Sequence, residues 1–144
     1  EFIIVSPPAK LVQVAALEGT LPRKLSESHR RLLLTWNGLN LEVVRLLGAP
    51  PVREGVDPIP KWQRVIPPRH SLWIAIGTDP AGFLYAEDED GSVWSIDHDG
   101  GAETRLAFSL DEFIGVYIFG TRAAEFGGDS WRDDLVTYGV LPTA

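Results

Sequence analysis

The sequence of 144 residues contains no cysteine and no methionine. Without cysteine the chain forms no disulfide, holds no iron–sulfur cluster or thiolate zinc site, and has no thiol nucleophile. It also has no apolar run approaching the roughly 18–20 residues that span a bilayer. We therefore expect a soluble, cytoplasmic protein without membrane contacts, in which residues 1–144 form a single domain.

Lysine and arginine are absent from residues 70–104, although this segment carries eight acidic residues. The whole chain has a net charge of −7, and the rest of it, with 13 basic and 12 acidic residues, is nearly neutral. A block of negative charge repels nucleic acid and anionic membranes and is compatible with a basic partner or a cation. Nucleic acid is therefore not an expected partner.

Motifs that hold a metal ion or a cofactor are also missing. The sequence has neither the phosphate-loop nor the dinucleotide spacing of glycines. The stretch from Asp88 to Gly91 resembles a fragment of a calcium loop, but Ala86 occupies the position of the first ligand. A hairpin turn explains Asp90 and Gly91 without a metal. The sequence thus predicts no metal and no cofactor.

The sequence also contains little that supports a catalytic function. No serine lies in a Gly-x-Ser-x-Gly elbow, the turn that presents a nucleophile in many hydrolases. Asp97, His98 and Asp99 suggest an acid–base group, but neighbouring strand residues point to opposite faces and converge only at a bulge. We predict a protein that is not an enzyme, with a hydrolase built on these three residues as the remaining catalytic alternative.

Helical patterns occupy the first part of the chain. A helix is predicted to begin after Pro7 and Pro8 and to end at Gly19. A second runs from about Ser26 to Trp36, ended by Asn37 and Gly38, which tolerate left-handed backbone angles. Residues 39–47 fit a helix or a strand. The proline-rich residues 48–60 read as a surface loop.

Strand patterns begin at Leu72. The runs 72–76, 83–88 and 92–96 have β-type composition, and Asp90-Gly91 between the last two is a strong hairpin signal. If these two residues form the turn, Glu87 faces Trp94. A helix then begins at Ser109, which forms a capping box with Glu112, and ends near Gly120. The remaining residues are expected to contain a short helix at about 131–138.

Two of the five tryptophans have polar neighbours. Trp36, Trp73 and Trp94 lie in apolar patterns and are predicted to pack in the core. Trp62 and Trp131 are surrounded by charged residues in the sequence. Each is therefore a candidate for an exposed aromatic anchor in a protein interface.

The order of these signals resembles a known family. Residues 25–38 are similar to the Leu-Pro-x-x-Tyr-x-x-Phe-Leu-x-x-Tyr/Trp-Asn-Gly signature of the SUKH superfamily, which includes the Smi/Knr-type proteins. Residues 74–86 resemble its Ile-Gly-x-x-x-x-Gly-x-x-Tyr/Ile segment. A strand at 91–94, the Asp97-His98 pair and the helix start at 106–114 follow in the family's order. The resemblance covers about residues 10–119 and leaves residues 120–144 as a C-terminal extension.

The resemblance implies an α+β fold, with a central, largely antiparallel sheet flanked by N-terminal helices and a capped C-terminal helix. Many bacterial members are regarded as immunity proteins that bind and neutralise a cognate toxin domain, often a nuclease. Fungal members act in cell-wall and signalling networks. The family has no established catalytic residues, so the resemblance implies a non-catalytic binding protein.

An acidic surface suits this role, because carboxylates can imitate phosphates in the basic groove of a nuclease toxin. Rim charges raise the association rate, while buried aromatic anchors contribute most of the affinity. A regulatory or scaffold module that binds a host protein is the alternative function, and a hairpin that is acidic only for solubility is the alternative interpretation of the charge. We predict as partner-binding residues the acidic Glu87, Asp88, Glu89, Asp90, Asp97 and Asp99 and the aromatic Trp62 and Trp131.

Overall fold

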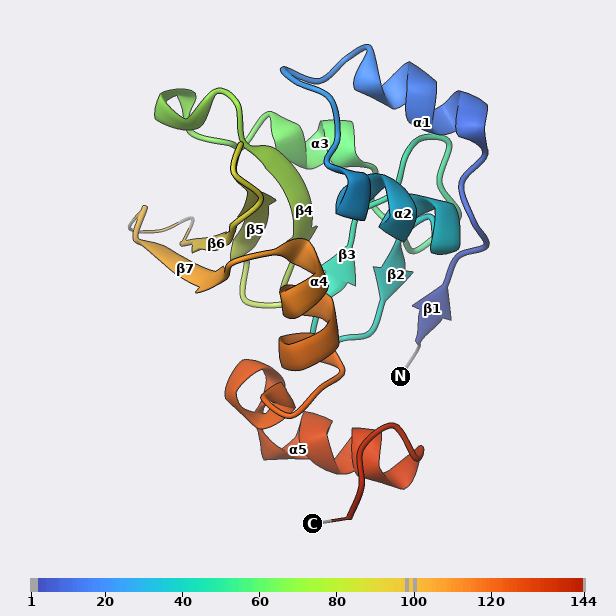
Figure 1. Cartoon of the computed structure of the whole chain (residues 1–144), viewed down its shortest axis with the longest axis vertical. Coiled ribbons are helices and arrows are strands. Elements are labelled where there is room, and N and C mark those ends of the chain that lie inside the picture. The colour runs from blue at the N-terminus through green and yellow to red at the C-terminus, as the bar shows by residue number, and fades with distance from the viewer. Residues whose placement is uncertain (1–2, 98, 100, 144) are drawn as a thin grey trace.

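The computed structural model describes residues 3–97, 99 and 101–143, and one antiparallel sheet dominates this part of the chain (Figure 1). The order of its strands follows their order in the sequence. Each strand pairs antiparallel with the next. The predicted α+β fold with a central antiparallel sheet is confirmed. The strands are β1 (Ile4–Val5), β2 (Leu39–Asn40), β3 (Arg45–Leu46), β4 (Ile74–Thr78), β5 (Leu84–Glu87), β6 (Val93–Ile96) and β7 (Glu103–Ala107).

Helices lie in the connections between strands and after the last strand. The two predicted N-terminal helices are present, and the ambiguous residues 39–47 form two short strands joined by a turn. Among the described residues, no helix is both long and apolar enough to cross a membrane. The helices are α1 (Leu11–Glu18), α2 (Glu27–Thr35), α3 (Ile59–Gln63), the 3₁₀ turn η1 (Pro68–His70), α4 (Leu110–Glu112), the π-helical η2 (Phe113–Ile118) and α5 (Ala123–Thr137).

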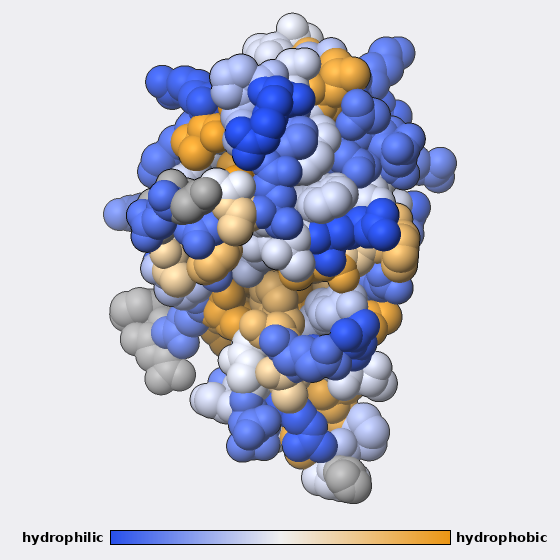
Figure 2. All heavy atoms as spheres, turned by 90° about the vertical axis from the view of Figure 1, so that its left-hand side faces the viewer, coloured by the Kyte–Doolittle hydropathy of each residue, from blue (hydrophilic) through white to orange (hydrophobic). Residues whose placement is uncertain are grey.

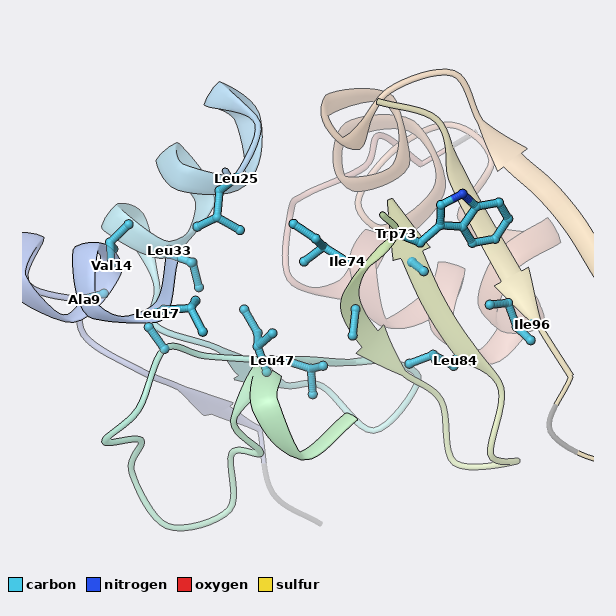
Figure 3. Close-up of a cluster of buried hydrophobic side chains, with 14 residues drawn as sticks. Ala9, Val14, Leu17, Leu25, Leu33, Leu47, Trp73, Ile74, Leu84 and Ile96 are labelled. Atoms are coloured by element: carbon cyan, nitrogen blue, oxygen red, sulfur yellow. The ribbon is translucent and has the colours of Figure 1, made fainter. Parts of the chain in front are cut away.

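Two hydrophobic clusters lie on opposite faces of the sheet. The first joins the sheet to α1, α2 and α3 (Figure 3). The second joins the other face to α4, η2 and α5. Alternate strand residues supply the two clusters, as the pleat requires: Leu84 and Ala86 belong to the first cluster and Tyr85 to the second. The C-terminal extension is therefore packed on the sheet through α5.

The predicted surface loop at 48–60 is exposed in its middle, at residues 50, 51 and 53–55, but it enters the core near both ends. The side chain of Asn37 donates to the carbonyl of Ala49 at 2.9 Å and accepts from its N–H at 2.7 Å. Ala49 and Ile59 are fully buried in the first cluster. Gly38 has φ 94° and turns the chain into β2. The start of this loop is therefore buried, and the side chain of Asn37 holds it there through Ala49.

The hairpin between β5 and β6 has a three-residue loop, so the predicted register is wrong by one residue. Glu87 pairs with Val93 rather than Trp94. The Asp88 N–H donates to the Ser92 carbonyl at 2.9 Å, and Gly91, with φ 92°, occupies the left-handed position of the loop. This is the type I turn with a following left-handed glycine that three-residue hairpins favour. A shift of one residue exchanges the two faces of a strand.

The predicted cap at Ser109 is confirmed. The Ser109 hydroxyl accepts from the Glu112 N–H at 3.0 Å, and the Glu112 carboxylate accepts from the Phe108 N–H at 2.8 Å. α4 continues directly into η2, which ends at Ile118. α5 is longer than the short helix predicted for the extension, and Gly128, with φ 83°, breaks its helical geometry. The extension therefore has more structure than the sequence indicates.

Candidate partner-binding surface

The end of the β5–β6 hairpin carries three predicted acidic residues, Asp88, Glu89 and Asp90, here called the acidic tip. Asp88 is half-buried. Its carboxylate accepts from the N–H groups of Asp90 and Ser92 and from the indole of Trp94, each at 2.9 Å. Glu89 and Asp90 are exposed. Asp88 therefore shapes the loop, whereas Glu89 and Asp90 present their carboxylates to solvent.

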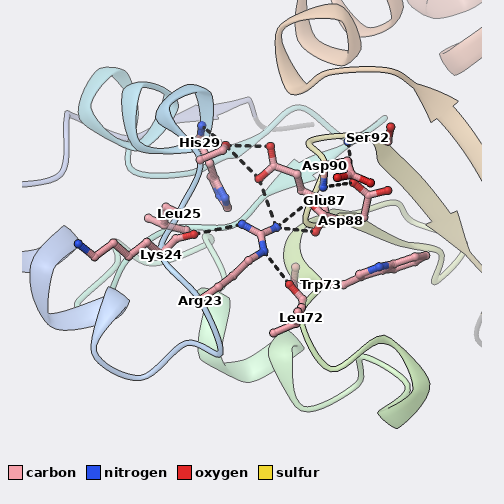
Figure 4. Close-up of polar contacts among 12 residues, drawn as sticks. Arg23, Lys24, Leu25, His29, Leu72, Trp73, Glu87, Asp88, Asp90 and Ser92 are labelled. Atoms are coloured by element: carbon pink, nitrogen blue, oxygen red, sulfur yellow. Dashed lines mark hydrogen bonds and ion pairs between the residues drawn. The ribbon is translucent and has the colours of Figure 1, made fainter.

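Glu87 does not belong to an exposed acidic surface, because its side chain is only 1% exposed. The Ser26 hydroxyl donates to its carboxylate, whose oxygens lie 3.0 and 2.8 Å away, and the Arg23 guanidinium lies 3.8 Å from one of them (Figure 4). Burial raises the pKa of Glu87, against the opposing effects of Ser26 and Arg23. The sequence-based placement of Glu87 at the surface is thus corrected: it ties β5 to the start of α2.

Arg23 holds the base of the acidic tip from the loop between α1 and α2. Its Nη2 donates to the carbonyls of Glu87 at 2.9 Å and Asp88 at 2.8 Å, and its Nε donates to the carbonyl of Leu72 at 2.7 Å. In Figure 4 the Arg23 guanidinium points from its loop toward Leu72, Glu87 and Asp88. Arg23 therefore ties the base of the acidic tip to the loop between α1 and α2.

His29 lies in the first turn of α2 and is fully buried. Neither of its ring nitrogens has a hydrogen-bond partner among the described residues. Burial lowers the pKa of His29 to about 4, and the nearby charge of Arg23 acts in the same direction. The folded protein therefore holds this side chain neutral.

We expect the fold to lose stability as the pH falls from 7 to 5. His29 takes up a proton near pH 6.5 in the unfolded chain but only near pH 4 in the folded one, so protons favour unfolding in this window. Linkage gives a loss of about 2 kcal/mol, measured by urea unfolding at both pH values. The raised pKa of Glu87 acts in the opposite sense.

The control is His29→Leu, which removes the titrating ring and keeps Glu87. The pH-dependent loss of this variant should be smaller than that of the wild type by about 2 kcal/mol. Equal losses in the two proteins would show that His29 does not set this dependence.

Asp97 and Asp99 lie beyond the opposite end of β6 from the acidic tip. Four strand residues separate Ser92 from Asp97, which corresponds to roughly 16 Å at about 3.3 Å per residue. The carboxylate of Asp97 accepts from the Asp99 N–H at 2.9 Å. His98, the remaining member of the predicted acid–base group, lies outside the described residues. The predicted acidic surface is therefore divided between two ends of one strand.

Trp62 and Asp97, which are far apart in the sequence, line one small hollow of about 180 Å³. The indole of Trp62 donates to the Asp57 carboxylate at 3.0 Å, and the Lys61 ammonium lies 5.7 Å from the ring centroid. The side chain is half-buried. These contacts orient Trp62 and leave part of its ring accessible.

Trp131 is not exposed, which corrects the expectation drawn from its charged neighbours. Its side chain is 7% exposed, and its indole donates to the Ile118 carbonyl at 2.7 Å. The ring packs near Phe119, with the centroids 6.3 Å apart. The charged neighbours point elsewhere because a helix turns about 100° per residue. Trp131 is a core residue that also forms a wall of a groove.

That groove and a second hollow lie between the sheet and the C-terminal extension. The groove, of about 300 Å³, runs between the β2–β3 turn and α5. The second hollow, of about 390 Å³, is lined by strand residues such as Tyr85 and by Phe126 of α5. Figure 2 shows apolar side chains at mid-height, between the sheet and the C-terminal segment. The sequence predicted neither, because their walls come from distant segments.

Metal binding has no support in the described part of the chain. There, no group of three or more histidine, aspartate or glutamate side chains is placed to hold an ion. The acidic tip uses Asp88 to bind its own loop and turns Glu89 and Asp90 outward. Glu89 and Asp90 are therefore the exposed carboxylates of the acidic tip.

Comparison with known proteins gives a family. A family model described as the SMI1/KNR4 family (SUKH-1) matches residues 8–115. The matched span includes the acidic tip and ends within η2, so α5 lies outside it. No curated protein matches the chain. Since the matched residues make up well over half of the sequence, the chain belongs to the SMI1/KNR4 family (SUKH-1).

Proposed function

We propose that this protein is an immunity protein that binds and neutralises a cognate protein toxin in the cytoplasm. Membership of the SUKH-1 family supports the proposal, because these domains are generally binding domains without catalytic activity. The observation that carries it is the exposed acidic tip, which Arg23 and Asp88 hold in one conformation. A toxin with a basic surface, such as a nuclease groove, is the partner that this charge favours.

The hydrogen bonds within and beneath the acidic tip favour binding. A loop that is already ordered loses little conformational entropy when it docks. Its carboxylates steer a cationic partner during approach, which raises the association rate more than the final affinity. Asp111, at the start of α4, also acts to raise the pKa of Glu87, but its own carboxylate is paired with Arg31 at 3.5 Å and adds little free charge. Asp111 lies seven residues beyond the acidic segment 70–104 and was not among the predicted binding residues.

The test is binding to the toxin domain encoded beside the gene for this chain. Replacing Glu89 and Asp90 by lysine should lower the association rate constant about tenfold at low salt and flatten its salt dependence. Surface plasmon resonance at several salt concentrations measures both. A matched variant, Glu54→Lys with Asp129→Lys, changes the net charge equally at exposed positions outside the acidic tip.

Protection of cells that express the toxin provides the functional readout. If the variant with lysine at positions 89 and 90 has the same association rate and salt dependence as the matched variant, the acidic tip does not steer the toxin. A chain that does not bind this toxin but binds a host protein would instead be a regulatory or scaffold module.

A further inference from the structure

The groove between the β2–β3 turn and α5 has properties that the proposed function does not use. Its walls come from the family domain on one side and from the extension on the other. Gly127 brings the walls together: a Cβ atom there would lie 2.5 Å from the Val43 side chain and 2.9 Å from that of Trp131. The two walls of the groove therefore approach each other closely at Gly127.

The lining of the groove combines exposed apolar side chains with negative charge. Ile3, Tyr138 and Val140 line it and are among the exposed large hydrophobic residues of the protein. Glu42 and Asp134 also line it, and no lysine, arginine or histidine does so among the described residues. A hollow whose described lining is largely apolar, with carboxylates as its charged groups, is complementary to a cation on an apolar stem.

The two carboxylates have no partner among the described residues. Neither Glu42 nor Asp134 makes a side-chain hydrogen bond or an ion pair there, in contrast to the neighbouring Asp133, which lies 3.9 Å from Arg132. Glu42 also has φ 71°, a left-handed conformation that glycine or asparagine adopts more readily. The backbone conformation at position 42 therefore does not favour a glutamate over glycine or asparagine.

We propose that this groove binds the side chain of an arginine or lysine that projects from a protein partner. The aliphatic stem lies along the apolar walls, and the charged end pairs with Glu42 and Asp134. Tyr138 adds a ring face for the cation. The groove is at the lower end of the size range of ligand sites and accommodates one long side chain. The inference takes from the proposed function only that the partner is a protein.

The experiment is an NMR titration of the full chain with N-acetyl-arginine methylamide and N-acetyl-lysine methylamide. The indole N–H of Trp131 is the reporter, because its ring lines the groove. Both probes should shift this resonance with saturation. N-acetyl-citrulline methylamide has almost the shape of the arginine probe without its charge and should bind at least about fivefold more weakly.

Substitutions identify the charges that bind. Glu42→Gln and Asp134→Asn should each weaken the arginine probe about threefold, and the double variant about tenfold. Asp133→Asn, on the same helix but outside the groove, should bind like the wild type. Equal binding of arginine and citrulline probes, no response of Trp131, or unchanged affinity in the double variant would each overturn the inference. Thermal unfolding confirms that each variant is folded.

The titration is independent of the toxin, so the two proposals can fail separately. If the chain binds the probes with saturation but does not bind the toxin, the proposed immunity function is wrong and the groove site is supported. If the double variant binds the toxin as tightly as the wild type and the Trp131 resonance does not shift with the probes, the groove site is wrong and the immunity function is supported.

Discussion

Replacing Arg23 by alanine should lower the free energy of unfolding by about 3 kcal/mol. The guanidinium donates to the carbonyls of Leu72, Glu87 and Asp88 and lies 3.8 Å from the buried Glu87 carboxylate. Removal of one member of a buried pair leaves the other charge without compensation, which costs more than the pair itself contributes. Urea denaturation at pH 7 measures the loss.

Two variants make this result specific. Arg31→Ala removes an arginine whose pair with Asp111, at 3.5 Å, has both side chains more than half exposed, so it should cost less than about 0.5 kcal/mol. Glu87→Gln in the Arg23→Ala background removes the stranded charge and should recover part of the loss. If Arg23→Ala and Arg31→Ala destabilise the fold equally, Arg23 does not hold the acidic tip as described.

Trp131→Ala should destabilise the fold by about 4 kcal/mol, and Trp62→Ala by about 1 kcal/mol. Trp131 is buried in the second hydrophobic cluster and donates to the Ile118 carbonyl, so truncation leaves a cavity and an unpaired carbonyl. Trp62 is half-buried and packs only at the margin of the first cluster. The two residues have similar neighbours in the sequence and different places in the structure.

Thermal and urea unfolding of both variants measures this difference. A single transition in Trp131→Ala, seen equally by fluorescence and circular dichroism, would show that the extension unfolds together with the sheet. A Trp131→Ala protein as stable as Trp62→Ala would contradict the packing of α5 on the sheet.

Local capping chemistry explains which elements the sequence predicts well. Ser26 and Ser109 accept from N–H groups three residues later, and Gly38 turns the chain after α2. Each interaction joins residues that are neighbours in the chain, so its pattern is visible without a structure. The hairpin register was wrong because Asp90-Gly91 fits a two-residue and a three-residue loop. The Asp88 carboxylate, which binds the loop N–H groups, favours the longer one.

The candidate site was less predictable because its properties depend on distant partners. The burial of Glu87 depends on Ser26 and Arg23, which lie 61 residues or more before it in the chain. The groove likewise requires Glu42 and Asp134 to line one hollow. A sequence pattern shows which residues are charged, but burial and pairing decide which charges remain available to a partner.

An open sheet whose strand order follows the chain has two edges, and both are poor templates for aggregation. Edge strands recruit other chains through their unpaired backbone groups. β1 at one edge has only two residues (Figure 1). β7 at the other is longer, but it carries the exposed Arg105, whose guanidinium lies 4.4 Å from the ring centroid of Phe108. A short strand and a charged strand are two ways in which sheets avoid uncontrolled strand addition, so neither edge of this sheet favours fibril growth.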